Sequence, residues 1–203
     1  MTLLNALIEN ARNVVFDVGC VLLTFEPERY VPLLVPGELG RKLPWELLYG
    51  SKAWEQLDQG VISEEGVALD TARRYGDESL WRQILPAVQR FNELMRPMPA
   101  TELIPRLHAA GKRVYVLSNY GRDGFARTAD RFQAIFSQMD GMVISSHELI
   151  CKPDPRIYRI LLERYGLDPH ETVFIDDRPV NIEGARAAGM QGIVYTGMDA
   201  LLK

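Results

Sequence analysis

The sequence contains few of the features that mark secreted or membrane proteins. It has only 2 cysteines among 203 residues, which is too few for a disulfide framework. It has no run near the roughly 18 apolar residues that a membrane-spanning helix needs. Its first residues show no basic leader followed by an apolar core and a cleavage site. We therefore expect a cytoplasmic protein with no membrane partner, in which Cys20 and Cys151 are unpaired thiols.

An excess of basic residues is also lacking, since 23 lysines and arginines stand against 27 aspartates and glutamates, for a net charge of −4. Proteins that bind the phosphate backbone of nucleic acids present a basic face. The charge balance thus argues against nucleic acid as a partner. It leaves room for a small phosphorylated metabolite, which needs only a local positive patch. Nothing in the sequence indicates a protein partner.

Internal repeats and low-complexity tracts are absent, and the apolar fraction of 47% is ordinary for a globular protein. Short apolar runs rich in β-branched and aromatic residues predict buried strands. Because the runs are apolar throughout, both faces of each strand should be buried, as in a parallel sheet. These runs are residues 14–16, 114–117, 142–144, 173–175 and 193–195.

Helical patterns alternate with these strands, at residues 100–110, 124–137, 155–165 and 179–188. Such alternation predicts an α/β fold with a Rossmann-like, doubly wound parallel sheet. Residues 26–97 show helical patterns instead, around 44–56, 63–75 and 78–94. We interpret residues 26–97 as a small helical cap domain inserted after the first strand, and residues 1–25 and 98–203 as the α/β core domain.

Polar residues follow the first four strands directly. In open α/β sheets the ligand site lies beyond the carboxyl ends of the strands, so these residues should converge. Asp17 follows the first strand and precedes Gly19. An acid in this place is often only a turn residue, but its carboxylate can also attack phosphorus and form an aspartyl-phosphate. Ser118 and Asn119 follow the second strand, where they can start a loop or bind a phosphoryl oxygen.

The remaining two polar segments carry opposite charges. Lys152 lies in a loop that Pro153 and Pro155 stiffen; such a lysine is usually only solvated, but here it can neutralise a nucleophile and phosphoryl oxygens. Asp176 and Asp177 end the fourth strand. Two adjacent carboxylates repel each other unless a hard cation such as Mg²⁺ lies beside them. Alternatively, Asp177 or the next residue caps the following helix.

Together these segments resemble the motifs of haloacid-dehalogenase-like hydrolases, and the resemblance covers nearly the whole chain. The matching segments are residues 16–22, 117–119, 152–158 and 174–177, with Asn181, Gly184, Ala185 and Gly189. Within the family the chain resembles the bacterial α-D-glucose-1-phosphate phosphatase-like branch, whose first motif also reads Asp-x-Gly-x-Val. The resemblance implies a Mg²⁺-dependent phosphatase for a small phosphate monoester, with sugar phosphates as the best class.

The resemblance also implies residue roles. Asp17 would be the nucleophile and a metal ligand. Asp177 and the backbone carbonyl of Gly19 would be further metal ligands, with Asp176 assisting directly or through water. Ser118, Asn119 and Lys152 would hold the phosphoryl group.

The sequence departs from the family pattern at Gly19, where most of these phosphatases have a second Asp that protonates the leaving oxygen and later activates water. Such acid–base catalysis is typically worth about 10²–10⁴-fold. Water, a substrate hydroxyl or a cap residue could take its place. Two alternatives remain: a metal-free haloacid dehalogenase, which needs no such acid but has no use for Asp176 and Asp177 together, and a non-catalytic phosphosugar-binding or regulatory protein.

Substrate choice should depend on the cap. Residues 54–60 are its predicted pocket-facing loop, in which Gly60 allows a sharp turn. Trp54 could serve as a platform for a sugar ring. An amphipathic helix more often buries its tryptophan, and we favour burial.

Overall fold

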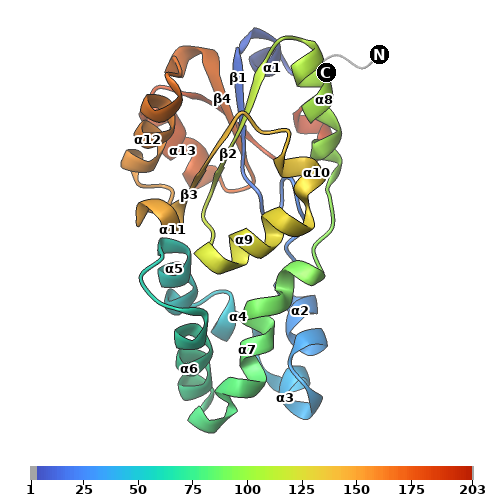
Figure 1. Cartoon of the computed structure of the whole chain (residues 1–203), viewed down its shortest axis with the longest axis vertical. Helices are drawn as coiled ribbons and strands as arrows, with labels where there is room; N and C mark the ends of the chain where they lie inside the picture. The colour runs from blue at the N-terminus through green and yellow to red at the C-terminus, as the bar shows by residue number, and fades with distance from the viewer. Residues whose placement is uncertain (1–3, 203) are drawn as a thin grey trace.

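The computed structural model describes residues 4–202 of the chain. Residues 1–3 and 203, which belong to the predicted core domain, lie outside the described residues. One half of the elongated molecule holds a sheet with helices on both sides, and the other half is a group of helices (Figure 1). No helix in the described part of the chain is long and apolar enough to cross a membrane.

The sheet has five strands, and all neighbouring strands are parallel. Their order is β3-β2-β1-β4-β5, so the first strand lies at the centre and the chain extends the sheet first on one side and then on the other. This is the predicted Rossmann-like, doubly wound arrangement, and each predicted strand is present. The strands are β1 (Asn13–Phe16), β2 (Arg113–Ser118), β3 (Gly141–Ile144), β4 (Thr172–Asp176) and β5 (Gln191–Val194).

The helices of the sheet-containing half cover both faces of the sheet. Alternate strand residues point to opposite faces. Val14 and Phe16 belong to a buried cluster with residues of α1, α8, α9 and α10, whereas Val15 and Phe174 pack in a second cluster with α12 and α13. The helices are α1 (Ala6–Asn10), α8 (Leu103–Ala109), α9 (Arg122–Arg131), α10 (Gln133–Phe136), α11 (Ser145–Glu148), α12 (Pro155–Tyr165) and α13 (Pro179–Ala187).

The elements within residues 26–97 are all helices, as the sequence predicts, although their number and bounds differ. The pattern at 44–56 is two helices, because Gly50 interrupts it and the Ser51 side chain accepts a hydrogen bond from the Trp54 N–H at the start of the second one. The helices are α2 (Pro27–Leu34), α3 (Gly37–Lys42), α4 (Trp45–Leu48), α5 (Lys52–Gln59), α6 (Glu64–Tyr75) and α7 (Trp81–Arg90). Short 3₁₀ turns complete the fold: η1 (Glu78–Leu80), η2 (Phe91–Glu93), η3 (Pro99–Glu102), η4 (Pro169–Glu171) and η5 (Met198–Ala200).

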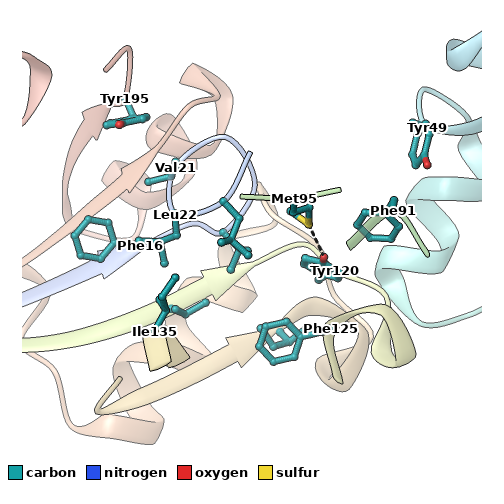
Figure 2. Close-up of a cluster of buried hydrophobic side chains, with 14 of the residues drawn as sticks. Phe16, Val21, Leu22, Tyr49, Phe91, Met95, Tyr120, Phe125, Ile135 and Tyr195 are labelled. Carbon is teal, nitrogen blue, oxygen red and sulfur yellow. Dashed lines mark hydrogen bonds between the residues drawn. The ribbon is translucent and has the colours of Figure 1, made fainter. Parts of the chain in front are cut away.

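Residues 22–24 and 96–98 connect helices α2–α7 to the sheet half, and these two segments pair with each other in antiparallel orientation. The Thr24 N–H donates to the Arg96 carbonyl at 2.9 Å, and the Met98 N–H donates to the Leu22 carbonyl at 2.8 Å. The buried cluster on one sheet face continues past these connections, through Met95, Phe91 and Tyr120, into the helical half (Figure 2). The helical half is therefore packed against the carboxyl edge of the sheet.

Candidate active site

The predicted polar residues meet at the carboxyl edge of the sheet. Asp17 follows β1 directly, Ser118 ends β2, and Asp176 ends β4. A cavity of about 950 Å³ opens between this edge and the helices of residues 26–97. Its lining includes the predicted site residues Asp17, Gly19, Ser118, Asn119, Lys152 and Asp177.

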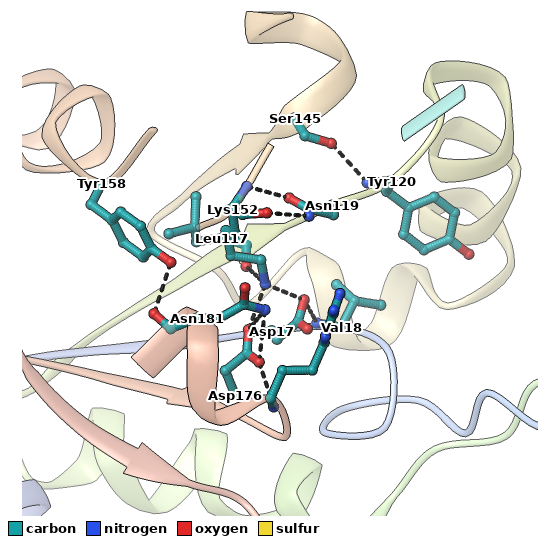
Figure 3. Close-up of polar contacts among 11 residues, drawn as sticks. Asp17, Val18, Leu117, Asn119, Tyr120, Ser145, Lys152, Tyr158, Asp176 and Asn181 are labelled. Carbon is teal, nitrogen blue, oxygen red and sulfur yellow. Dashed lines mark hydrogen bonds and ion pairs between the residues drawn. The ribbon is translucent and has the colours of Figure 1, made fainter. Parts of the chain in front are cut away.

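Lys152 is the buried cation at the centre of this site, with 4% of its surface exposed. Its Nζ lies 2.9 Å from Asp17 Oδ1 and 2.7 Å from Asp176 Oδ2, and it donates to the Leu117 carbonyl at 3.0 Å (Figure 3). A buried ammonium is tolerated when it is paired and hydrogen-bonded in this way. Burial by itself lowers the pKa of Lys152, but the charges of Asp17 and Asp176 outweigh it and raise that pKa above its usual value.

Asn119 holds the loop that carries Lys152. Its side-chain Nδ2 donates to the Lys152 carbonyl at 3.0 Å, and its Oδ1 accepts from the Lys152 N–H at 2.8 Å. Both ends of the amide are therefore bonded to one backbone unit, which fixes the place of the lysine. The predicted contact of Asn119 with a phosphoryl group stays a prediction.

Asp176 is fully buried, and both of its oxygens have protein partners. Oδ1 accepts from the Arg178 N–H at 2.8 Å, Oδ2 accepts from Lys152, and the Asn181 amide lies 3.0 Å from both oxygens. Tyr158 in turn donates its hydroxyl to the Asn181 carbonyl at 2.8 Å. Asp176 thus links β4, α13 and the Lys152 loop. The sequence resemblance included Asn181 among the matching residues but assigned it no role.

The carboxylates of Asp17, Asp176 and Asp177 fit a divalent cation. Each offers an oxygen, and these oxygens lie within 4.8 Å of one another. Carboxylate oxygens are the ligands that Mg²⁺ prefers. Asp17 and Asp176 are buried and Asp177 is partly exposed.

The protonation behaviour of these groups reflects their crowding. Burial raises the pKa of Asp17 to about 6; Lys152 opposes this rise, Asp176 adds to it, and a hydrogen bond from Ser118 lowers it. Burial and the Asp176 charge likewise raise the pKa of Asp177. The site therefore holds more negative charge than Lys152 can neutralise.

Gly19 lines the cavity with backbone only. A Cβ built there would meet only the Phe25 Cβ, at 3.8 Å, and its φ lies outside the left-handed region. Neither steric crowding nor the backbone conformation therefore requires a glycine here, and a longer side chain could begin at this position.

Aromatic rings form the cavity wall that the helical half provides. Trp54 is 8% exposed, which confirms its predicted burial, yet it also lines the cavity. Its ring centroid lies 4.6 Å from that of Tyr49 and 5.5 Å from that of Phe91. The Tyr49 hydroxyl donates to the Ala87 carbonyl at 2.6 Å. The wall consequently offers ring surface to a ligand.

Asp58, near the end of α5, is a further acid in the cavity lining. It belongs to the predicted pocket-facing loop, but no sequence pattern distinguished it from the other residues of that loop. The one available signal was indirect: the missing acid at Gly19 required a substitute, and residues 54–60 contain acids.

One class of α/β enzymes has a doubly wound parallel sheet with an Asp directly after the central strand. Its members also carry a lysine in a later loop and an acid pair at the end of a neighbouring strand, as Lys152 and Asp176–Asp177 do here. Within that class, the chain belongs to the haloacid dehalogenase-like hydrolases, whose family model matches residues 9–189. The protein is thus a hydrolase of this family, as the sequence resemblance implied.

Two relatives match over most of their length. Sesquiterpene phosphatase astK of Aspergillus oryzae is 26% identical over 183 residues, which are 90% of this chain and 88% of that protein. Fructose-1-phosphate phosphatase YqaB of Escherichia coli is 24% identical over 191 residues, which are 91% of this chain and 96% of that protein. Haloacid dehalogenases also occur among the similar proteins. Some relatives are far longer, and the chain spans as little as 9% of one of them.

Among solved structures, a haloacid dehalogenase family enzyme of Bacteroides thetaiotaomicron in complex with magnesium and inorganic phosphate has a TM-score of 0.72 at 21% identity. The match covers 92% of this chain and 95% of that one. At this identity the likeness shows the shared fold.

Proposed function

We propose that the protein is a magnesium-dependent phosphatase that hydrolyses a small phosphate monoester through an aspartyl-phosphate on Asp17. The cluster of three carboxylates from Asp17, Asp176 and Asp177 is the observation that supports this most directly. Three carboxylates beside one lysine leave surplus negative charge, which a divalent cation neutralises. Relatives named as phosphatases match nearly the whole chain.

In this proposal Mg²⁺ would be held by Asp17, Asp177 and the Gly19 carbonyl, with Asp176 assisting directly or through water. When bound, the ion would supply positive charge that offsets the charge of the phosphoryl oxygens. Asp176 also positions Lys152, since its Oδ2 lies 2.7 Å from the lysine Nζ.

The chemistry on the protein side begins with Asp17. Its carboxylate oxygen bonds to phosphorus while the bond between phosphorus and the leaving oxygen breaks, and water then hydrolyses the aspartyl-phosphate. Lys152, whose Nζ lies 2.9 Å from Asp17 Oδ1, and Ser118 would hold the phosphoryl oxygens. Asn119 assists by fixing the Lys152 loop.

For the substrate we propose the sugar phosphates that the sequence resemblance implied, a choice supported by the fructose-1-phosphate phosphatase relative. The aromatic wall supports a second candidate, an ester with an apolar leaving group. Rings of Phe25, Trp54 and Phe91 line the cavity, and the relative named as a sesquiterpene phosphatase is consistent with this candidate. Both candidates are small phosphorylated metabolites.

The dehalogenase alternative has less support. A dehalogenase needs no cation, and without one the carboxylates of Asp17, Asp176 and Asp177 repel each other at close range. The binding-protein alternative does not account for a nucleophilic carboxylate beside a buried lysine. We also propose that helices α2–α7 form the cap domain predicted at residues 26–97. The enzyme would work in the cytoplasm without nucleic acid, membrane or protein partners.

The test is phosphate release from a panel of monoesters that includes glucose 1-phosphate, fructose 1-phosphate and farnesyl phosphate. We expect release with Mg²⁺, none with excess chelator, and a loss of at least about a thousand-fold in an Asp17→Asn variant. Asp130→Asn, the same substitution at an exposed acid of α9 that does not line the cavity, is the matched control and should keep its activity.

Each other result points elsewhere. Halide release from a 2-haloacid in the presence of chelator would establish the dehalogenase. A folded protein that binds a phosphosugar but releases no phosphate from any ester would establish the binding protein.

A further inference from the structure

The proposed reaction needs a proton donor on a defined side of the phosphorus. Displacement at phosphorus is in line, so the leaving oxygen lies opposite Asp17. Because the Asp17 side chain extends from the carboxyl edge of the sheet into the cavity, the opposite side of the phosphorus faces the helices of residues 26–97. The attacking water of the second step enters on the same side. One carboxyl there can therefore serve both steps.

Gly19 offers no side chain for this task, but Asp58 lines the same cavity from α5, on the helical side. Its charge interacts with those of Asp17 and Lys152, which places it within electrostatic reach of both. It also affects the pKa of Cys151 and Tyr120 on the sheet side. Asp58 and the predicted nucleophile Asp17 thus line the same cavity, Asp58 from the helical half and Asp17 from the sheet half.

Contacts with the sheet half hold Asp58 in this position. The Ser145 hydroxyl donates to the Asp58 carbonyl, and the Gly121 N–H donates to its carboxylate. The next residue, Gln59, donates to the Leu149 carbonyl at 3.2 Å. The end of α5 is therefore docked on two segments of the sheet half, the Gly121 loop and α11, which gives the Asp58 carboxyl a defined direction.

The surroundings of Asp58 also bring the titration of its carboxyl close to neutral pH, where it can both give and take a proton. Burial raises its pKa to about 7; the charges of Asp17 and, more weakly, Glu55 add to the rise, while the Gly121 N–H and Lys152 lower it. A general acid is most effective when its pKa lies near the working pH.

Other acids of the cavity are less suited to the task. Asp154 is paired with Arg156 at 2.7 Å, and this pairing lowers its pKa to about 2, so it carries no proton at neutral pH. Glu55 is exposed to solvent. Asp177 belongs to the cluster of three carboxylates proposed to bind the cation.

We propose that Asp58 is the general acid and base that replaces the family's missing carboxyl at Gly19. In the first step Asp17 bonds to phosphorus, the bond from phosphorus to the leaving oxygen breaks, and the Asp58 proton passes to that oxygen to give an alcohol. In the second step the Asp58 carboxylate takes a proton from water as that water bonds to phosphorus. The bond from phosphorus to Asp17 breaks, which gives inorganic phosphate and restores both carboxyls. This role rests on the proposed phosphatase function.

Esters with different leaving groups test this role, because p-nitrophenolate leaves without a proton and an alkoxide does not. For Asp58→Asn we expect a loss of about 10²–10⁴-fold in kcat on the best alkyl phosphate of the panel. The first-step rate on p-nitrophenyl phosphate, measured as the burst of p-nitrophenol, should stay near that of wild type. Asp130→Asn, the same substitution at an exposed acid of α9 that does not line the cavity, should change neither rate.

Asn keeps the acceptor for the Gly121 N–H, so the variant should fold, which circular dichroism checks. An equal loss on both esters, or no loss on the alkyl ester, would overturn the role of Asp58. If Asp58→Asn fails to fold, wild-type pH profiles decide instead. Turnover of the alkyl ester should fall as pH rises above about 7, where Asp58 loses its proton, while the p-nitrophenol burst should not; parallel profiles refute the role. The phosphatase function itself fails only if wild type releases phosphate from neither ester.

Discussion

At the scale of single residues, Lys152 and Asp176 are the pair on which the site depends. Lys152 is 4% exposed and Asp176 has no exposed surface, so their charges interact where water cannot screen them. The polar contacts of this pair reach strand ends, the loop that carries Lys152, and helix α13. The pair therefore joins three segments of the site and places an ammonium group next to Asp17.

Replacing Lys152 with Met should destabilise the protein, because it leaves the buried Asp176 and Asp17 carboxylates uncompensated. Breaking a buried pair from one side typically costs about 3–5 kcal/mol. Urea unfolding followed by circular dichroism measures this change. The matched control is Lys42→Met, since Lys42 forms an exposed pair with Glu38 and its loss should cost at most about 1 kcal/mol. Equal stability of the two variants would show that the buried pair adds nothing to folding.

At the scale of elements, the end of α5 links the helical half to the sheet half. Gly60 ends this helix with φ at +81°, and a Cβ built on it would lie 2.6 Å from the Ser146 carbonyl oxygen. Both the left-handed backbone and the close approach of α5 to α11 therefore require glycine. The position of Asp58, two residues earlier, depends on this approach.

Gly60→Ala should both destabilise the protein and reduce its turnover of alkyl phosphates, since α5 must move away from α11. Gly76→Ala is the matched control: Gly76 also ends a helix in the left-handed region, with φ at +107°, but nothing lies within 4 Å of its Cβ position. The control should lose only about 1 kcal/mol to backbone strain and keep its activity. Thermal unfolding and phosphate release measure the two effects. Equal effects in both variants would rule out the importance of the close approach.

At the scale of the whole molecule, the three clustered carboxylates couple cation binding to the free energy of unfolding. Asp17, Asp176 and Asp177 lie on segments that only the folded chain brings within 4.8 Å of one another. A cation that binds this group binds the folded state and not the unfolded chain. Its binding free energy therefore adds to the free energy of unfolding.

Added Mg²⁺ should accordingly raise the Tm of the wild-type protein. At a hundred-fold excess over Kd the stabilisation is about 2.7 kcal/mol, and each kcal/mol raises the Tm of a chain this long by roughly 2–4 °C. Asp17→Asn should show a much smaller increase, whereas Asp130→Asn, at an exposed site outside the cavity lining, should match wild type. Differential scanning calorimetry with and without chelator measures this without any substrate. A Tm that Mg²⁺ leaves unchanged would count against the proposed cofactor.

Much of the fold could be predicted because its signals are local. Buried parallel strands require short apolar runs, and the predicted runs 14–16, 114–117, 142–144 and 173–175 lie within observed strands. The helices α2 and α3 were not predicted. Pro32 lies inside α2, and Gly37 and Gly40 lie in α3, so neither segment shows an uninterrupted amphipathic pattern. Their packing in the helical half stabilises them against these weak local preferences.

The sequence by itself determined the order of strands and helices and the polar residue at each strand end. From these, the carboxyl-edge site with Asp17, Lys152 and Asp177 follows, because parallel strands bring their ends together. Only the tertiary structure decided which atoms are in contact. It directs Asn119 to the Lys152 backbone, encloses Asp176 in protein contacts, and brings Asp58 into the cavity that Asp17 also lines. The physical reason is that these contacts join segments far apart in the chain, whose approach depends on how the two halves pack and leaves no local pattern.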